Sequence, residues 1–243
     1  MRLAFRFRVM PCIATVLVMM LGIALGNWQT HRAEGKIAIE RSMTERRAEP
    51  LLEIRGQPEQ ASAIEFRRVV ARGEFDAAWP VYLDNRPYQG RAGFYLFMPF
   101  RLANSQHAVL VARGWIPRDP QQRTRLPVIA VPSGPVWVEG FARPSVGRVM
   151  ALGQEAPLVP GAIVQNLALA DVARASGHVL QTFIIEQTND SGDGLVRDWP
   201  LPTTGIDKHR GYAFQWYALA ATALLFFLVT GFRRASKSDS NAS

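Results

Sequence analysis

The 243-residue sequence contains one cysteine, Cys12, so no intramolecular disulfide can stabilise the fold. It also contains no glycine-rich phosphate loop, no G-x-S-x-G motif and no H-E-x-x-H motif, which excludes the enzyme classes that carry them. The segment from Asn189 to Gly194 resembles a calcium loop, but Pro200 occupies the position where a bidentate Glu is required. We interpret this segment as a solvated turn, and we expect a protein that is not an enzyme.

Long charge-free apolar runs are absent except at the two ends of the chain. Residues 9–30 and 211–232 are 22 residues each and contain no charged side chain. As a helix, each would span about 33 Å, which matches a hydrocarbon core of about 30 Å. The sequence therefore predicts a membrane protein with transmembrane helices over residues 9–30 and 210–232.

A cleaved signal peptide is the alternative interpretation of the first run. Ala24-Leu25-Gly26 has the small-x-small pattern of a cleavage site. However, the run is longer than the usual apolar region of about 7–15 residues in a signal peptide. Trp28 also lies where an aromatic residue of the membrane interface is expected. We therefore favour a retained membrane anchor.

The net charge of +8 gives little support to nucleic-acid binding, because much of it flanks the two apolar runs. The first eight residues carry +3 and the last eleven carry +2, which leaves +3 for everything between them. Short flanks rich in Arg and Lys stay in the cytoplasm, whereas long loops translocate largely regardless of charge. We expect residues 1–8 and 233–243 to be cytoplasmic and residues 31–209 to be periplasmic.

The segment between the two runs is predicted to be mostly antiparallel β structure with one or two short helices. A helix is expected to continue from the first run and to end near Pro50. One further helix is predicted over Leu167–Ala175, closed by Gly177, and a last strand over Val179–Gln187, before a loop over Thr188–Asp207. Short runs rich in β-branched and aromatic residues, separated by turn residues, indicate the other strands: Val69–Ala71 with Phe75, Trp79–Leu83, Gly93–Phe97, Ala108–Ala112 and Val136–Gly140.

The four histidines fall into two pairs. His107 and His178 follow predicted turn or helix-end residues, so we expect both at the surface. His31 and His209 each lie just beyond the outer end of a predicted span. On a helix continued outward from the second span, His209 shares one face with three apolar or aromatic residues: Tyr212, Trp216 and Leu219. This face is either a metal-ligating site or an interfacial aromatic belt with a solvated histidine.

From the segment Leu25–Gln29 in the first apolar run to the segment Lys208–Ala220 at the second, several motifs lie in an order that resembles the Surfeit-locus family of cytochrome c oxidase assembly proteins. The entry segment Leu25–Gln29, followed by Arg32 and Lys36, resembles the family's L-G-x-W-Q-x-x-R-x-x-x-K signature. The closing segment Lys208–Ala220 is similar to its H-x-x-Y-x-x-x-W signature. Other segments similar to family motifs lie between these two: Phe66–Phe75, Asn85–Pro87, Pro99–Leu102 and Val111–Pro117. One departure is that Asp207, Lys208 and Arg210 surround the final histidine, where many members have Asn before it and Leu after it.

The resemblance implies a bacterial inner-membrane chaperone without catalytic turnover that helps to place haem a in cytochrome c oxidase subunit I, with haem a synthase as a further partner. It implies His209 as the axial ligand of the haem iron, Tyr212 and Trp216 as walls of the haem site, and Arg210 as a propionate partner. Three residues of the first span are expected to face them: Trp28, Gln29 and Arg32. The alternative is a membrane-tethered β domain that acts as a scaffold for a partner protein without haem.

The remaining motif residues are expected to have mainly structural roles. Gly73 and Gly114 are predicted at turns or bulges where a side chain would not fit. Arg86 and Arg113 are expected to pair with carboxylates of the domain, and the functional alternative is contact with the oxidase subunit. Trp115 and Trp137 are predicted to be core aromatics.

Overall fold

The computed structural model describes residues 3–5, 7–122, 124–146, 157–200 and 205–234. The chain divides into two compact units, Met1–Arg41 with Pro202–Ser243, and Ser42–Leu201. Several residues of the predicted tails and loop lie outside the described residues: Arg2, Arg6, Lys237, Asp239 and residues 201–204.

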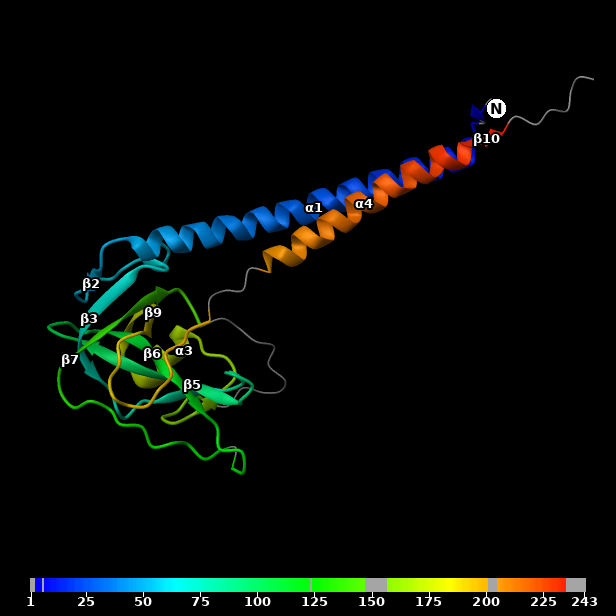
Figure 1. Cartoon of the computed structure of the whole chain (residues 1–243). Coiled ribbons are helices and arrows are strands. Elements are labelled where there is room, and N and C mark those ends of the chain that lie inside the picture. Colours follow the sequence, from blue (N-terminus) through cyan, green and yellow to red (C-terminus); the bar gives the residue numbers. More distant parts are fainter. Residues whose placement is uncertain (1–2, 6, 123, 147–156, 201–204, 235–243) are drawn as a thin grey trace, which may run out of the picture. The chain divides into compact units, whose positions relative to one another are not determined.

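The first unit consists of two long helices that run antiparallel, side by side in Figure 1. They are α1 (Val9–Ala48), whose last turns belong to the second unit, and α4 (Ile206–Gly231). At the ends of the chain, β1 (Leu3–Phe5) pairs antiparallel with β10 (Phe232–Arg234). Only 11% of the most apolar window of each helix is buried, which is unlike the core helix of a soluble protein. The chain is therefore a membrane protein with two candidate membrane-spanning helices.

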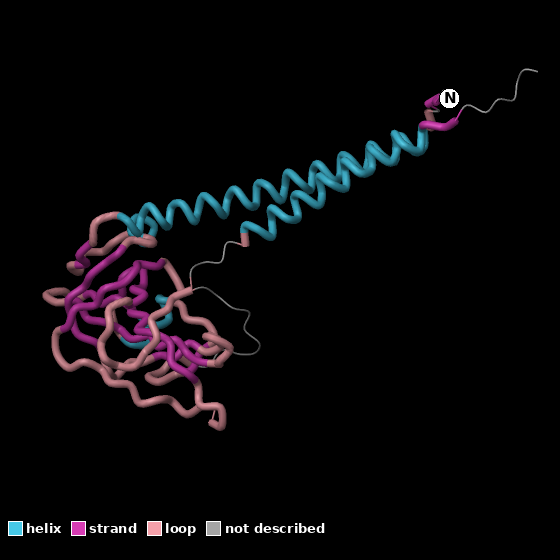
Figure 2. The backbone as a smooth tube through the Cα atoms, in the orientation of Figure 1, coloured by secondary structure: helices cyan, strands magenta, loops and turns pink. Residues whose placement is uncertain are grey.

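The second unit is built on an eight-stranded sheet that closes on itself. The strands follow the order β2-β3-β7-β9-β6-β5-β4-β8, and a further pairing of β3 with β5 joins five of them into a ring. Figure 2 shows these strands gathered in one body. The bounds of the strands are as follows: β2 (Leu52–Ile54), β3 (Arg68–Phe75), β4 (Val81–Leu83), β5 (Gly93–Leu102), β6 (His107–Pro117), β7 (Val136–Arg143), β8 (Ile163–Val164) and β9 (Val179–Gln187).

Most pairings among the described strands are antiparallel, which confirms the predicted β architecture. Parallel pairs join β2 to β3, β4 to β8 and β6 to β9. The chain between β6 and β9 is long enough for a parallel crossover, since it contains β7, β8 and α3 (Leu169–Ser176). The α1 helix ends two residues before Pro50, and α3 ends at Ser176 with Gly177 as its left-handed C-cap, so both predicted helix ends are confirmed.

The interior of the ring is filled by alternate residues of its strands. Leu96, Met98 and Phe100 of β5 point into it, and so do Val109 and Val111 of β6. The residues between them, such as Phe97 and Leu110, belong to a second core on the outer side of the sheet, with Val172 of α3. Because β5 and β6 are covered on both faces, their central residues form nearly continuous apolar runs.

The two predicted core tryptophans have different environments. Trp115 is 3% exposed, as expected, and its indole Nε1 donates to Arg86 O at 2.6 Å. Trp137 is 52% exposed, so that prediction is wrong. The period-two alternation of β7 turns Val138 into the ring and therefore Trp137 outward. There the guanidinium of Arg72, its cross-strand partner, lies over its ring.

Gly114 and Gly73 lie where a side chain does not fit, as predicted. At Leu96/Phe97 the register of β5 against β6 shifts from Gly114 to Ala112, so Arg113 is the extra residue of a β-bulge. Gly114 has φ +152°, and a Cβ there would lie 2.7 Å from Leu195 Cβ. A Cβ at Gly73 would overlap the backbone of the neighbouring strand.

The histidines of the second unit are less exposed than predicted. The side chain of His178 is 18% exposed, and its Nε2 lies 2.8 Å from Asp76 Oδ2. His107 is half-buried, with its backbone N–H bonded to Ser105 Oγ. The expectation of surface positions is therefore wrong for His178, because the loop after β3 folds over the start of β9.

Candidate functional site

The α1 and α4 helices of the first unit meet along a seam of residues spaced three and four apart. This spacing is that of two helices packed nearly parallel or antiparallel over a long distance. On α1 the seam contains Cys12, Thr15, Met19, Gly22, Gly26, Gln29, Ala33 and Lys36, and on α4 it contains Ile206, His209, Ala213, Trp216, Ala220, Ala223, Phe227 and Gly231.

Two glycines allow the helices to approach closely. A Cβ at Gly22 would lie 2.9 Å from Trp216 O, and one at Gly26 would lie 2.5 Å from Tyr217 Cε1. Small residues four apart are typical of helices that associate inside a membrane. Polar groups are also satisfied across the pair, since Tyr217 Oη donates to Asn27 Oδ1 at 2.7 Å. The Gly22-x-x-x-Gly26 spacing is a local sequence signal that could have indicated this seam, which was not predicted.

His209 lies in the first turn of α4, at the end of the helix pair remote from the chain termini. Its Nδ1 lies 2.7 Å from Gln29 Oε1 on α1. A carbonyl oxygen can only accept a hydrogen bond, so this contact puts the imidazole proton on Nδ1. The Nε2 atom then carries the lone pair, and no hydrogen bond to it is found among the described residues. The arrangement is that of an oriented imidazole with one nitrogen available as a ligand.

The structure brings only some of the predicted site residues together. Trp216 is half-buried in the seam, and Tyr212 is 51% exposed on the same helical face as His209. Arg210 is exposed. Of the three α1 residues expected to face this site, Gln29 contacts His209. Trp28 is 51% exposed, and the Arg32 guanidinium lies over its ring.

His31 lies on the exposed side of α1, away from the seam. Its side chain is 80% exposed, and its Nδ1 contacts Glu34 Oε2 at 3.2 Å. No group of three or more His, Cys, Asp or Glu side chains that could hold a metal ion occurs in the described part of the chain. Any metal bound at His209 would therefore need further ligands from another source, as haem supplies from its ring nitrogens.

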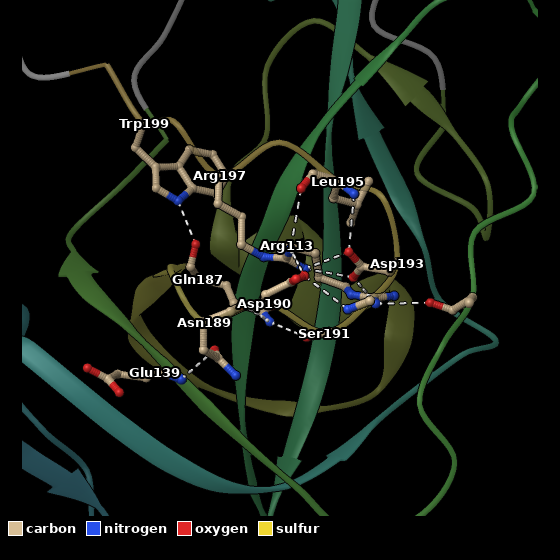
Figure 3. A network of polar contacts seen from close by, with 12 residues as sticks. Arg113, Glu139, Gln187, Asn189, Asp190, Ser191, Asp193, Leu195, Arg197 and Trp199 are labelled. Carbon is tan, nitrogen blue, oxygen red and sulfur yellow. Dashed lines mark hydrogen bonds and ion pairs between the residues drawn. The ribbon is translucent and has the colours of Figure 1, made fainter.

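In the second unit, Arg113 and Asp193 form an ion pair whose side chains are both fully buried (Figure 3). Arg113 Nη2 lies 2.7 Å from Asp193 Oδ2 and donates to Ala130 O at 3.1 Å, and the guanidinium stacks over Phe75. Burial lowers the pKa of Arg113, and Asp193 opposes this shift. The predicted pairing of Arg113 with a carboxylate is thus confirmed.

A second arginine binds the same carboxylate. Arg197 Nη2 lies 2.8 Å from Asp193 Oδ1 and 2.7 Å from Oδ2. The interpretation of Asn189–Gly194 as a solvated turn is therefore wrong for Asp193, although Asp190 is 87% exposed. The turn packs against the ring of strands because the guanidinium of the bulge residue Arg113 points inward and requires a buried counter-charge. No local pattern could have indicated this long-range pairing.

Arg86 departs from the expectation of pairing with a carboxylate. Its backbone is fixed on both sides, since its N–H donates to Gly93 O and its C=O accepts from Trp115. Its half-buried side chain forms no ion pair within the described ranges, and Nη1 reaches only Asn85 O, at 3.4 Å. Burial lowers its pKa, an effect opposed by Tyr95 and Asp84.

Comparison with known proteins gives one family. The model of the SURF1 family matches residues 16–221. Surfeit locus protein 1 of Mus musculus is 25% identical over 87% of this chain and 73% of its own length. A SURF1-like protein of Rickettsia bellii is 24% identical over 89% of each chain. The cytochrome oxidase assembly protein SHY1 of Saccharomyces cerevisiae is 31% identical over 39% of this chain and 25% of its own length.

Proposed function

Because the chain belongs to the SURF1 family, we propose that it is an assembly factor for cytochrome c oxidase and that it holds haem a at the His209 end of the α1/α4 pair. The assembly role is supported by the family match over residues 16–221 and by the similarity to the cytochrome oxidase assembly protein of yeast. The role is that of a chaperone without catalytic turnover, which passes haem to oxidase subunit I, with haem a synthase as the donor.

The observation that carries the haem proposal is the contact between His209 and Gln29. Haem iron accepts an imidazole nitrogen as an axial ligand. A ligating histidine usually donates its other ring N–H to a fixed acceptor, which sets the tautomer and the ring orientation. Gln29 Oε1 is such an acceptor at 2.7 Å, so Nε2 of His209 is the atom that would bind iron.

The surroundings of His209 suit an amphipathic ligand. Tyr212 and Trp216 continue from it along α4 and offer an aromatic surface to the apolar face of haem. Arg210 is exposed next to the histidine and can pair with a propionate.

In the proposed orientation, the second unit lies on the periplasmic side of a bacterial inner membrane. The antiparallel helices put both chain ends on the same side of a bilayer. Arg8, Arg233 and Arg234 lie at that end, and short Arg-rich flanks remain in the cytoplasm. This orientation puts His209 at the periplasmic side.

A protein-binding scaffold without haem is the second candidate, and Trp137 is the observation that favours it. Trp137 is 52% exposed on the outer face of β7, and the Arg72 guanidinium lies over its ring. Tryptophan and arginine are enriched at the centres of protein–protein interfaces. In this case Trp137→Ala would remove co-purification of the oxidase subunit, whereas His209→Ala would not.

The test is an absorption spectrum of detergent-purified protein from cells that make haem a. The wild-type protein should show a Soret band at near-stoichiometric haem, and His209→Ala should show a shifted or much weaker band at the same protein yield. His31→Ala is the matched control, because His31 is exposed on the other side of α1 and should leave the band unchanged. Identical spectra for all three proteins would contradict the haem site and favour the scaffold.

A further inference from the structure

A cavity of about 350 Å³ opens on the outer face of the second unit, away from the interior of the ring. Its floor consists of Phe97, Ala112 and Ile184, which come from the adjacent strands β5, β6 and β9. Ala112 lies on the central one of these three strands and is the smallest of the three floor residues. A volume of this size lies at the lower end of small-molecule sites, which are typically about 300–1,000 Å³.

One wall of the cavity is a fixed aromatic pair. The rings of Tyr95 and Trp199 have centroids 4.9 Å apart and an interplanar angle of 46°. Trp199 Nε1 donates to Gln187 O at 2.7 Å, which holds the indole against the end of β9 (Figure 3). The ion pair between Arg197 and Asp193 further fixes the segment that carries Trp199. The aromatic wall is thus preorganised, which reduces the entropy lost when a ligand binds.

The charged groups of the cavity leave one positive charge uncompensated. Glu186 and Arg143 face each other, with Arg143 Nε 3.6 Å from Glu186 Oε1. Arg86 is half-buried and has no carboxylate within ion-pair distance among the residues that the structure describes. Asp84, whose charge acts on the pKa of Arg86, forms its own ion pair with Arg118 at 3.4 Å. A desolvated guanidinium without a counter-ion favours a carboxylate, which it can bind through two hydrogen bonds.

We propose that this cavity binds a small amphipathic carboxylate, with the anionic group on Arg86 and an apolar body between the Tyr95–Trp199 wall and the floor at Ala112. A cation is disfavoured, because Glu186 is already offset by Arg143. A polyphosphate is disfavoured, because one guanidinium is the sole uncompensated charge among the described lining residues. The site lies in the second unit and is independent of His209.

The test is isothermal titration of the full-length detergent-solubilised protein with phenylbutyrate, corrected by a titration of detergent alone. The uncharged phenylbutyramide keeps the apolar body and removes the carboxylate. We expect saturable binding of phenylbutyrate and, for Arg86→Gln, an affinity about tenfold lower. Arg91→Gln is the matched control, because Arg91 is exposed in the same hairpin and carries the same charge; it should change the affinity less than about twofold.

The comparison of the acid with the amide uses the unaltered protein, so it does not depend on how well Arg86→Gln folds. We expect the amide to bind the wild-type protein about as weakly as phenylbutyrate binds Arg86→Gln. Equal affinities for the acid and the amide would overturn the proposal. So would heats no larger than those of the detergent blank up to about 10 mM phenylbutyrate.

Discussion

His209 of α4 and Gln29 of α1 are joined by a 2.7 Å contact between Nδ1 and Oε1, across 180 residues of sequence. Replacement Gln29→Leu removes the acceptor and leaves the imidazole free to rotate and to change tautomer. Loss of such a supporting group typically lowers metal affinity by about 10–100-fold, and we expect this range for haem binding measured by titration. Gln29→Glu keeps an acceptor oxygen and should retain most of the affinity. An unchanged affinity in Gln29→Leu would show that Gln29 does not orient the ligand.

Removal of the buried counter-charge in the second unit should strongly destabilise the fold. Asp193→Asn leaves the guanidiniums of Arg113 and Arg197 without their shared carboxylate. Breaking a buried pair costs about 3–5 kcal/mol, because an uncompensated charge remains inside the protein. Urea unfolding followed by tryptophan fluorescence measures the loss. Asp190→Asn is the control, since that side chain is 87% exposed, and it should cost less than about 0.5 kcal/mol. Similar losses in the two variants would contradict the importance of burial.

The seam of the helix pair depends on Gly26. In Gly26→Ile the new side chain overlaps the ring of Tyr217, so the helices must separate. Gly35→Ile is the control, because nothing lies within 4 Å of a Cβ at Gly35. Spin labels at positions 7 and 227, whose native rings are 6.3 Å apart, report the separation in a Cys12→Ser background. We expect a longer or broader distance distribution for Gly26→Ile alone. The same distribution in both variants would contradict the close approach.

Glu186 gives the second unit a defined dependence on pH. Burial raises its pKa above the ordinary value of 4.5, and the attraction of Arg143 and Arg47 opposes this shift. The folded state therefore binds more protons than the unfolded state above about pH 4.5, so the free energy of unfolding falls as pH rises through this window. Below pH 4.5 the contribution of Glu186 is fully present.

The replacement Glu186→Gln removes this titrating carboxyl group. The free energy of unfolding of the variant should therefore depend less on pH above about 4.5. The difference between the unfolding free energies of the wild-type protein and the variant should fall as pH rises from 4.5 and then level off above the folded-state pKa. Urea unfolding at a series of pH values measures it. A difference that rises with pH would show that the attraction of the arginines exceeds the cost of burial.

Elements whose signals are local could be predicted from the sequence. The bounds of β9, Val179–Gln187, follow from a run of apolar and β-branched residues after the left-handed Gly177, and the structure gives the same bounds. The closure of the ring by β3 and β5 could not be predicted, because these strands are separated by β4 and nothing in their own residues specifies the pairing.

Within the sites, position on an element was predictable and long-range contact was not. The helical face of His209 followed from its spacing to Tyr212 and Trp216. The burial of Asp193 did not, because a turn rich in Asn, Asp and Gly has the composition of a solvated loop and its burial depends on Arg113, 80 residues away. Trp137 was placed wrongly for a similar reason. Alternation along β7 puts Trp137 and Val138 on opposite faces of the sheet, but only the pairing of β7 with β3 shows which of the two faces is the interior.

The most direct test of the proposed function is the haem a content of cytochrome c oxidase in membranes of cells that lack this chain. The wild-type chain and His31→Ala should restore the oxidase spectrum and activity. His209→Ala, present at the same level in the membrane, should leave the catalytic subunit deficient in haem a. Full restoration by His209→Ala would contradict the claim that this chain serves the oxidase by holding haem at that residue.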